Sequence, residues 1–180
     1  MLPSMKRILI IPIGSADPAI LKTISASLEI TFHCMIEIGS EMPIPLTSYD
    51  SRRHQYYSTT ILETLRDITR RDRDRVLGVA DADLFVPGLN FVFGEADASA
   101  GVAVISLTRL RQEFYGFRRN TRLFHDRAVK EGIHELGHTC GLGHCPDPHC
   151  IMHFSNSLWD TDKKGQEFCT RCKKLYVISS

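Results

Sequence analysis

The residues best suited to chemistry lie in one short stretch that begins at His134 and reads His-Glu-Leu-Gly-His-Thr-Cys-Gly-Leu-Gly-His. On an α-helix, residues four apart share a face, so His134 and His138 can direct two imidazoles at one metal ion. Glu135 follows His134, where a general base for a metal-activated water is expected. Gly141 lets the chain leave the helix, which brings His144 back as a third ligand. Three protein ligands leave one coordination position open, which is typical of a catalytic zinc site.

A second group of metal-binding residue types begins at the next residue. Four cysteines follow the pattern C-x4-C, a gap of 18 residues, and then C-x2-C. They are Cys145, Cys150, Cys169 and Cys172. Four thiolates at such spacing form a closed tetrahedral site, so a structural zinc is expected. The residues alone also allow two disulfides, or a mixed ligand set in which His149, His153 or Cys140 replaces a cysteine.

The histidine motif followed at once by these cysteines resembles the archaemetzincin family of zinc metalloproteases. The resemblance rests on residues 134–172, including Cys150-Ile151-Met152 and Cys169-Thr170-Arg171-Cys172. It implies a zinc-dependent peptidase with one catalytic and one structural zinc, acting on short peptides, with aminopeptidase-like cleavage among its modes. In the wider metzincin clan a methionine in a tight turn lies beneath the catalytic zinc, and Met152 takes that place.

We therefore expect hydrolysis of peptide bonds by a zinc-activated water, with Glu135 as the general base. Two zinc ions are expected per chain, one at the histidines and one at the cysteines. Because His144 and Cys145 are adjacent, we expect the structural zinc to fix the loop that presents His144 and so to set affinity at the catalytic site.

Three other functions compete with this interpretation. The first is a zinc-binding interaction module with little or no peptidase activity, although a purely structural site has no need of Glu135. The second is a zinc ribbon that binds nucleic acid, since Lys163, Lys164, Lys173 and Lys174 surround the cysteines. The third is a hydrolase of other carbonyl compounds, such as a deacylase, because the same kind of site can attack them.

Composition limits the range of partners. The chain has 180 residues and a net charge of +1, so no general attraction to nucleic acid or to anionic membranes is expected. No apolar run approaches the roughly 20 residues of a membrane helix. Besides the four clustered cysteines only Cys34 and Cys140 remain, a usage that suits a reducing cytoplasm. We expect a monomer that acts on a peptide or protein substrate.

The apolar pattern predicts strands alternating with helices, and hence an α/β fold with a mixed, mostly parallel twisted sheet. Strands are expected over 6–13, 30–38, 75–80, 91–93 and 101–107, and helices over 18–28, from 50 or 51 to 68, 122–139 and 166–178. We expect a single domain over 1–180, with an α/β part over 1–144 and a small zinc-binding subdomain over 145–180. The catalytic zinc is expected in the cleft between these two parts.

Substrate recognition is indicated by two weaker features. Residues 90–98 are either an exposed strand edge, with which a peptide can pair, or a plain connecting strand. Five arginines precede the active-site helix, where they either attract a substrate carboxylate or form a solvated face. They are Arg109, Arg111, Arg118, Arg119 and Arg122.

Overall fold

The computed structural model describes residues 7–68 and 74–179, and these form a five-stranded sheet in the order β2-β1-β5-β8-β7. Its strands are β1 (Arg7–Ile13), β2 (Met35–Ile38), β5 (Asp74–Ala80), β7 (Gly94–Asp97) and β8 (Val102–Ser106). All neighbours pair in parallel except β7, which lies antiparallel to β8 at one edge. The mixed, mostly parallel sheet expected from the sequence is thus confirmed.

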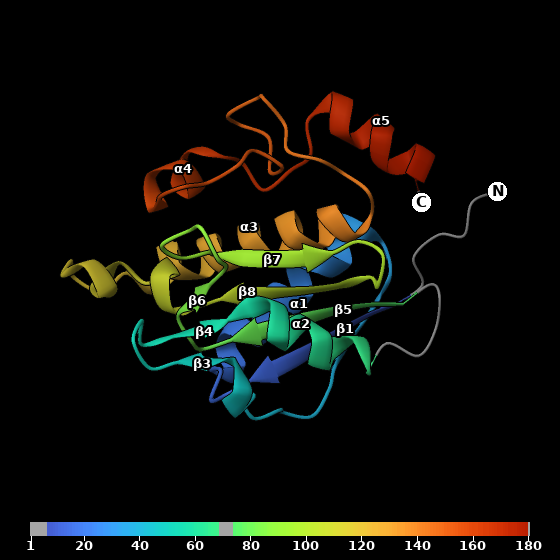
Figure 1. Cartoon of the computed structure of the whole chain (residues 1–180). Helices are drawn as coiled ribbons and strands as arrows, with labels where there is room; N and C mark the ends of the chain where they lie inside the picture. The colour runs from blue at the N-terminus through green and yellow to red at the C-terminus, as the bar shows by residue number, and fades with distance from the viewer. Residues whose placement is uncertain (1–6, 69–73, 180) are drawn as a thin grey trace.

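Helices cover both faces of this sheet (Figure 1). Helices α1 (Pro18–Phe32) and α3 (Thr121–Thr139) pack on one face and α2 (Ser58–Arg66) packs on the other, whereas α4 (Leu158–Lys163) and α5 (Thr170–Ser179) lie over α3. Side chains alternate across a strand, so neighbouring residues of β8 enter different cores: Ile105 joins the core with α1 and α3, and Val104 the core with α2. All five residues of β8 are buried, as expected for the strand predicted over 101–107.

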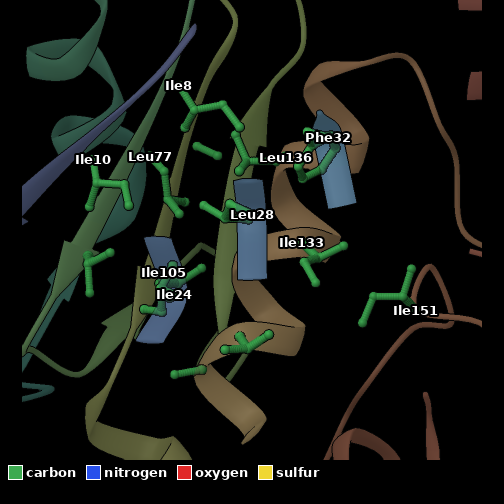
Figure 2. Close-up of a cluster of buried hydrophobic side chains, with 14 of the residues drawn as sticks. Ile8, Ile10, Ile24, Leu28, Phe32, Leu77, Ile105, Ile133, Leu136 and Ile151 are labelled. Atoms are coloured by element: carbon green, nitrogen blue, oxygen red, sulfur yellow. The ribbon is translucent and has the colours of Figure 1, made fainter. Parts of the chain in front are cut away.

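The core between the sheet, α1 and α3 fixes the helix that carries the histidine motif (Figure 2). Ile133 and Leu136 of α3 are buried there against Leu28 of α1 and against strand residues such as Ile105. The apolar positions of α3 therefore face the sheet, and its histidines are directed elsewhere. Ile151, from the segment after the motif, joins the same core and ties the C-terminal part to α3.

Helix α1 begins as predicted, because the Asp17 side chain accepts a hydrogen bond from the Ala19 N–H at 2.9 Å and Pro18 takes the first helical position. Its end was predicted wrongly. Residues 30–32 belong to the helix, and the strand predicted over 30–38 is confined to Met35–Ile38. Leu28 and Phe32 continue the helical spacing of buried residues, and His33 then ends the helix in a left-handed conformation.

The helix predicted from residue 50 or 51 starts only at Ser58. The residues before it form β3 (Tyr49–Asp50) and β4 (Gln55–Tyr57), which make a small sheet with β6 (Leu84–Phe85) from later in the chain. The Asp50 side chain accepts hydrogen bonds from the N–H groups of Arg52 and Arg53, and this local turn competes with helix formation. A second error concerns residues 91–93, because the edge strand begins at Gly94.

The segment from Cys145 onward lies over α3 and carries two helices (Figure 1). The sequence predicted one helix over 166–178, where α5 begins at Thr170, and did not predict α4. Arg127 of α3 makes two hydrogen bonds to the carboxylate of Asp162 in α4, at 2.6 and 2.7 Å. Among the described residues, none of the helices is long and apolar enough to cross a membrane.

Candidate metal centre and active-site cleft

Helix α3 and the turn after it bring the three predicted histidine ligands together. His134 and His138 lie one helical turn apart, and Gly141, with φ +84°, reverses the chain so that His144 faces them. One ring nitrogen of each histidine lies within 4.8 Å of those of the other two.

Hydrogen bonds orient two of these rings. His134 Nδ1 lies 2.8 Å from the carbonyl oxygen of Ile151, and His138 Nδ1 lies 2.7 Å from that of Leu142. Carbonyl oxygens only accept, so each Nδ1 carries the proton and each Nε2 presents a lone pair. These two Nε2 atoms face one another at 3.1 Å, where lone pairs repel unless they share a cation. The donor set thus fits a metal ion held by Nε2 atoms, with carbonyls orienting the rings from behind.

The electrostatics of the site favour neutral imidazoles. Burial lowers the pKa of His134 well below 6.5, and the nearby positive charge of Lys164 acts in the same direction. Burial is also the main cause that lowers the pKa of His138 and of His144. Neutral imidazole is the form that binds metals, so these rings are ready to act as ligands at neutral pH.

Glu135 lies at the wall of the cleft, directly against the edge strand. A Cβ atom placed on Gly94 would come within 2.6 Å of Glu135 Cγ and 2.7 Å of Oε1, closer than real side chains pack. Burial raises the pKa of Glu135 well above 4.5, and the negative charge of Glu131 raises it further. Only a glycine at position 94 leaves room for this carboxyl group, a requirement that has no local signal in the sequence.

Met152 packs against the turn of α3 that lies between His134 and His138. It is fully buried, and a Cβ on Gly137 would come within 2.5 Å of its sulfur atom. The Met152 carbonyl accepts a hydrogen bond from the Cys145 N–H at 2.9 Å, which ties it to the residue after His144. The methionine therefore supports the helix turn that carries the first two histidines.

The four clustered cysteines also meet. Their sulfur atoms lie within 4.8 Å of one another, and Cys145 and Cys169 are separated by 3.8 Å, well beyond the length of a disulfide bond. All six cysteines of the chain are free in the structure. Within the cluster, the Cys172 N–H lowers the pKa of Cys169 to about 7, whereas burial raises the pKa of Cys150 and of Cys172.

The residues considered as alternative ligands take other places. His153 Nδ1 lies 2.9 Å from the Cys145 carbonyl oxygen, so this ring supports the loop backbone. Cys140 is buried at the C-terminal end of α3, and neither it nor His149 belongs to the cysteine cluster.

A cavity of about 370 Å³ opens in front of the histidines. One side is formed by residues 89–96, which include β7, and the other by His144 and residues 154–156. Glu131, His134, Glu135 and His138 of α3 complete its lining. The outer edge of β7 is the free edge of the sheet, within the segment that the sequence predicted for peptide pairing.

The arginines before α3 divide into two groups. Arg109 and Arg111 form paired hydrogen bonds with the carboxylates of Asp83 and Asp81, and so hold the loop after β8 against the sheet. Arg118, Arg119 and Arg122 are exposed. The first group is thus engaged within the fold, and the second is exposed to solvent.

A buried ion pair near the cavity was also missed. Lys164 Nζ lies 2.8 Å from Glu131 Oε1, with the two side chains 0% and 3% exposed. The partners are 33 positions apart in the chain, and no local pattern links them.

The histidine cluster with its buried glutamate, on a helix packed under an edge strand, is the arrangement of a zinc metallopeptidase. The model of peptidase family M54 matches residues 34–176. The archaemetzincin of Pyrococcus furiosus is 44% identical over 172 residues, 92% of this chain and 89% of that protein. That of Methanocaldococcus jannaschii is 44% identical over 168 residues, 93% and 91% of the two chains.

Solved structures agree with the sequence comparison. The archaemetzincin of Methanopyrus kandleri superposes with a TM-score of 0.86 at 35% identity, covering 99% of this chain and 98% of that one. A zinc-dependent peptidase of Methanocorpusculum labreanum gives a TM-score of 0.86 at 30% identity, covering 94% and 99%. The chain belongs to peptidase family M54, the archaemetzincins, and is a zinc metallopeptidase that acts on peptide or protein substrates.

Proposed function

We propose that this chain hydrolyses peptide bonds with water at a zinc ion held by His134, His138 and His144, and that Glu135 is the general base. The observation that carries the proposal is the 3.1 Å approach of the His134 and His138 Nε2 atoms beside a buried carboxyl group at the wall of a cavity. When bound, zinc supplies Lewis acidity, which lowers the pKa of a water molecule and polarises a carbonyl group.

Glu135 moves the proton in this proposal. Its carboxylate takes a proton from the attacking water and then delivers it to the nitrogen of the leaving amine. The contact with Gly94 keeps the carboxylate at the cleft wall, so that little reorganisation precedes the transfer. The surroundings that raise its pKa also make the protonated form accessible for the second half of the reaction.

The substrate binds in extended form along the free edge of β7. The cavity volume of about 370 Å³ has room for a few side chains around the scissile bond, which supports action on short peptides. A second zinc at the four cysteines holds the segment from residue 145 as a small subdomain, and its role is structural.

A mixed peptide library tests this function. Peptides with free and with acetylated N-termini are incubated with the zinc-loaded protein, the chelated protein and Glu135→Gln, and products are identified by mass spectrometry. Glu63→Gln, at an exposed position of α2, is the matched control. We expect cleavage by the wild type and by the control only, and the acetylated peptides report whether a free amine is required.

Cleavage by Glu135→Gln at the wild-type rate would contradict the role of Glu135. Absence of cleavage by the zinc-loaded wild type would favour the binding module considered from the sequence.

A further inference from the structure

Large apolar side chains gather at the surface next to the catalytic cavity. Trp159, the single tryptophan of the chain, is 75% exposed, and Phe117 is 67% exposed. Phe114 and Tyr115 of the same loop are also exposed. Isolated exposed apolar residues are common in soluble proteins, but a contiguous group with a concave shape marks a binding surface.

Of these side chains, Tyr115, Phe117 and Trp159 line a second pocket of about 300 Å³. It is lined by Phe91, Tyr115, Phe117, Asn156, Ser157, Leu158 and Trp159. None of these residues is charged, and they come from three separate segments: the approach to β7, the loop after β8 and the start of α4. Phe91 and Asn156 also line the catalytic cavity, so the two spaces adjoin.

Charged partners restrain parts of two walls of this pocket. The Arg109 guanidinium lies 4.4 Å from the centre of the Phe91 ring and 4.6 Å from that of Phe114, while it hydrogen-bonds to Asp83. On the other wall, the Asp160 carboxylate accepts hydrogen bonds from the Asn156 N–H and the Ser157 hydroxyl. Phe91, Asn156 and Ser157 are therefore restrained before a ligand arrives, which lowers the entropic cost of binding at these positions.

We propose that this apolar pocket is a second substrate subsite, which binds an aromatic or large aliphatic side chain of the peptide outside the metal-centred cavity. The proposal rests on the peptidase function given above. Its occupant is the substrate because a chain that lies along the catalytic cavity passes Phe91 and Asn156 and enters the pocket without leaving the surface. A pocket without charged walls favours an apolar side chain over a charged one.

The position of the pocket predicts where that side chain stands in the peptide. Gly94 marks the level of Glu135, and Phe91 precedes it by three residues. Three residues of extended chain span at most about 10 Å. The apolar residue of the substrate is thus expected two or three positions from the scissile bond, rather than next to it.

Trp159 provides a direct reporter, because it is the single tryptophan and lies in the pocket wall. The probes are dye-labelled twelve-residue peptides of alanine and serine, each with one phenylalanine at a different position, and one peptide without phenylalanine. They are titrated into zinc-loaded Glu135→Gln, which keeps them intact. Anisotropy of the dye gives the affinity, and a parallel titration with unlabelled peptide follows the Trp159 emission.

We expect peptides with phenylalanine to bind about tenfold more tightly than the peptide without it, and to shift the Trp159 emission. In the Glu135→Gln background, Phe117→Ala is expected to remove most of this preference without changing the affinity of the phenylalanine-free peptide. Ile30→Ala, which truncates an equally exposed residue of α1, is the control and is expected to keep the preference. Wild-type protein should cleave these peptides two or three residues from the phenylalanine.

Equal affinities with and without phenylalanine, an unchanged Trp159 emission, or no binding of any peptide would overturn the subsite. Loss of preference in Ile30→Ala to the same extent as in Phe117→Ala would overturn it as well. Failure of the peptidase proposal would look different. The phenylalanine peptides would still bind more tightly and shift the Trp159 emission, but the wild type would leave them uncut. Cleavage without any phenylalanine preference leaves the peptidase standing and removes the subsite.

Discussion

The buried ion pair between Lys164 and Glu131 makes a quantitative prediction about how the C-terminal segment is held on α3. Lys164 directly follows α4, and its side chain is 0% exposed, while that of Glu131 is 3% exposed. Each charge has been removed from water, and the 2.8 Å contact is what compensates for that loss. The Thr161 hydroxyl lies 3.5 Å from the same carboxylate, at the limit of a hydrogen bond.

Replacing Lys164 with methionine keeps the bulk of the side chain and removes its charge. The carboxylate of Glu131 then stays buried without its cation, which costs about 3–5 kcal/mol in the free energy of unfolding. For a chain of this length each kcal/mol moves the melting temperature by about 2–4 °C, so a decrease of roughly 10 °C is expected. Glu131→Gln combined with Lys164→Met removes both charges, and we expect it to regain most of the lost stability.

The assay is urea unfolding of the zinc-loaded proteins, followed by circular dichroism and by Trp159 fluorescence at constant zinc concentration. Lys163→Met is the matched control, because Lys163 is the neighbouring lysine and is exposed. The urea midpoint of this variant should equal that of the wild type. A loss below about 1 kcal/mol in Lys164→Met, or a double variant as unstable as the single one, would refute the reasoning about the buried pair.

Three further predictions concern the metal centre. Gly94→Ala is expected to lower kcat at least tenfold with little change in zinc content, because the new Cβ displaces the Glu135 carboxyl group. Gly132→Ala is the control and should keep kcat, because its Cβ meets ordinary contacts at 3.5 Å; equal kcat values for the two variants would contradict the prediction. Cys172→Ser is expected to empty the cysteine site and to weaken zinc binding at the histidines, which titration with a zinc-sensitive dye measures. Wild-type zinc affinity at the histidines would reject the coupling between the two sites. In the metal-free protein, burial raises the pKa of Glu135, so the free energy of unfolding falls as pH rises from 4.5 towards that higher pKa. Glu135→Gln removes this loss and should therefore raise the free energy of unfolding more at about pH 7 than at about pH 5. An equal increase at both pH values would contradict the shift.

Most of what the sequence predicts about the site follows from the spacing of residues that are close together in the chain. His134 and His138 are one helical turn apart, and Gly141 is the residue type that permits the reversal to His144, so local geometry is enough to predict that the three histidines meet. The same holds for the start of α1, where Asp17 and Pro18 act within one turn. Strand β8 was predictable because a continuous apolar run is typical of a strand buried on both faces.

The errors arose where two local preferences compete. Residues 30–32 have the β-branched and aromatic character of a strand, but their spacing from Leu28 places Phe32 in the core as part of α1. At Asp50, a side chain that caps a turn resembles one that begins a helix, and packing of Tyr56 beside Leu84 in a small sheet decided the outcome. Such pairing depends on distant residues and has no local signal.

The parts of the site that the sequence did not predict are contacts between distant segments. Gly94 and Glu135 are 41 positions apart, and the glycine is distinguished only by the carboxyl group that fills the space of its missing side chain. The apolar pocket likewise combines Phe91, Phe117 and Trp159 from three segments. Each residue has an ordinary interpretation in its own segment, and only the fold brings the three together around one pocket.

The most direct test of the central claim is to determine zinc content and peptide cleavage on the same samples of wild type and Glu135→Gln. The account predicts two zinc ions per chain in both proteins by native mass spectrometry, with cleavage by the wild type and loss of at least a hundredfold in the variant, in the range by which removal of a general base slows a reaction (about 10²–10⁴). Equal cleavage by both proteins at full zinc occupancy would contradict the account.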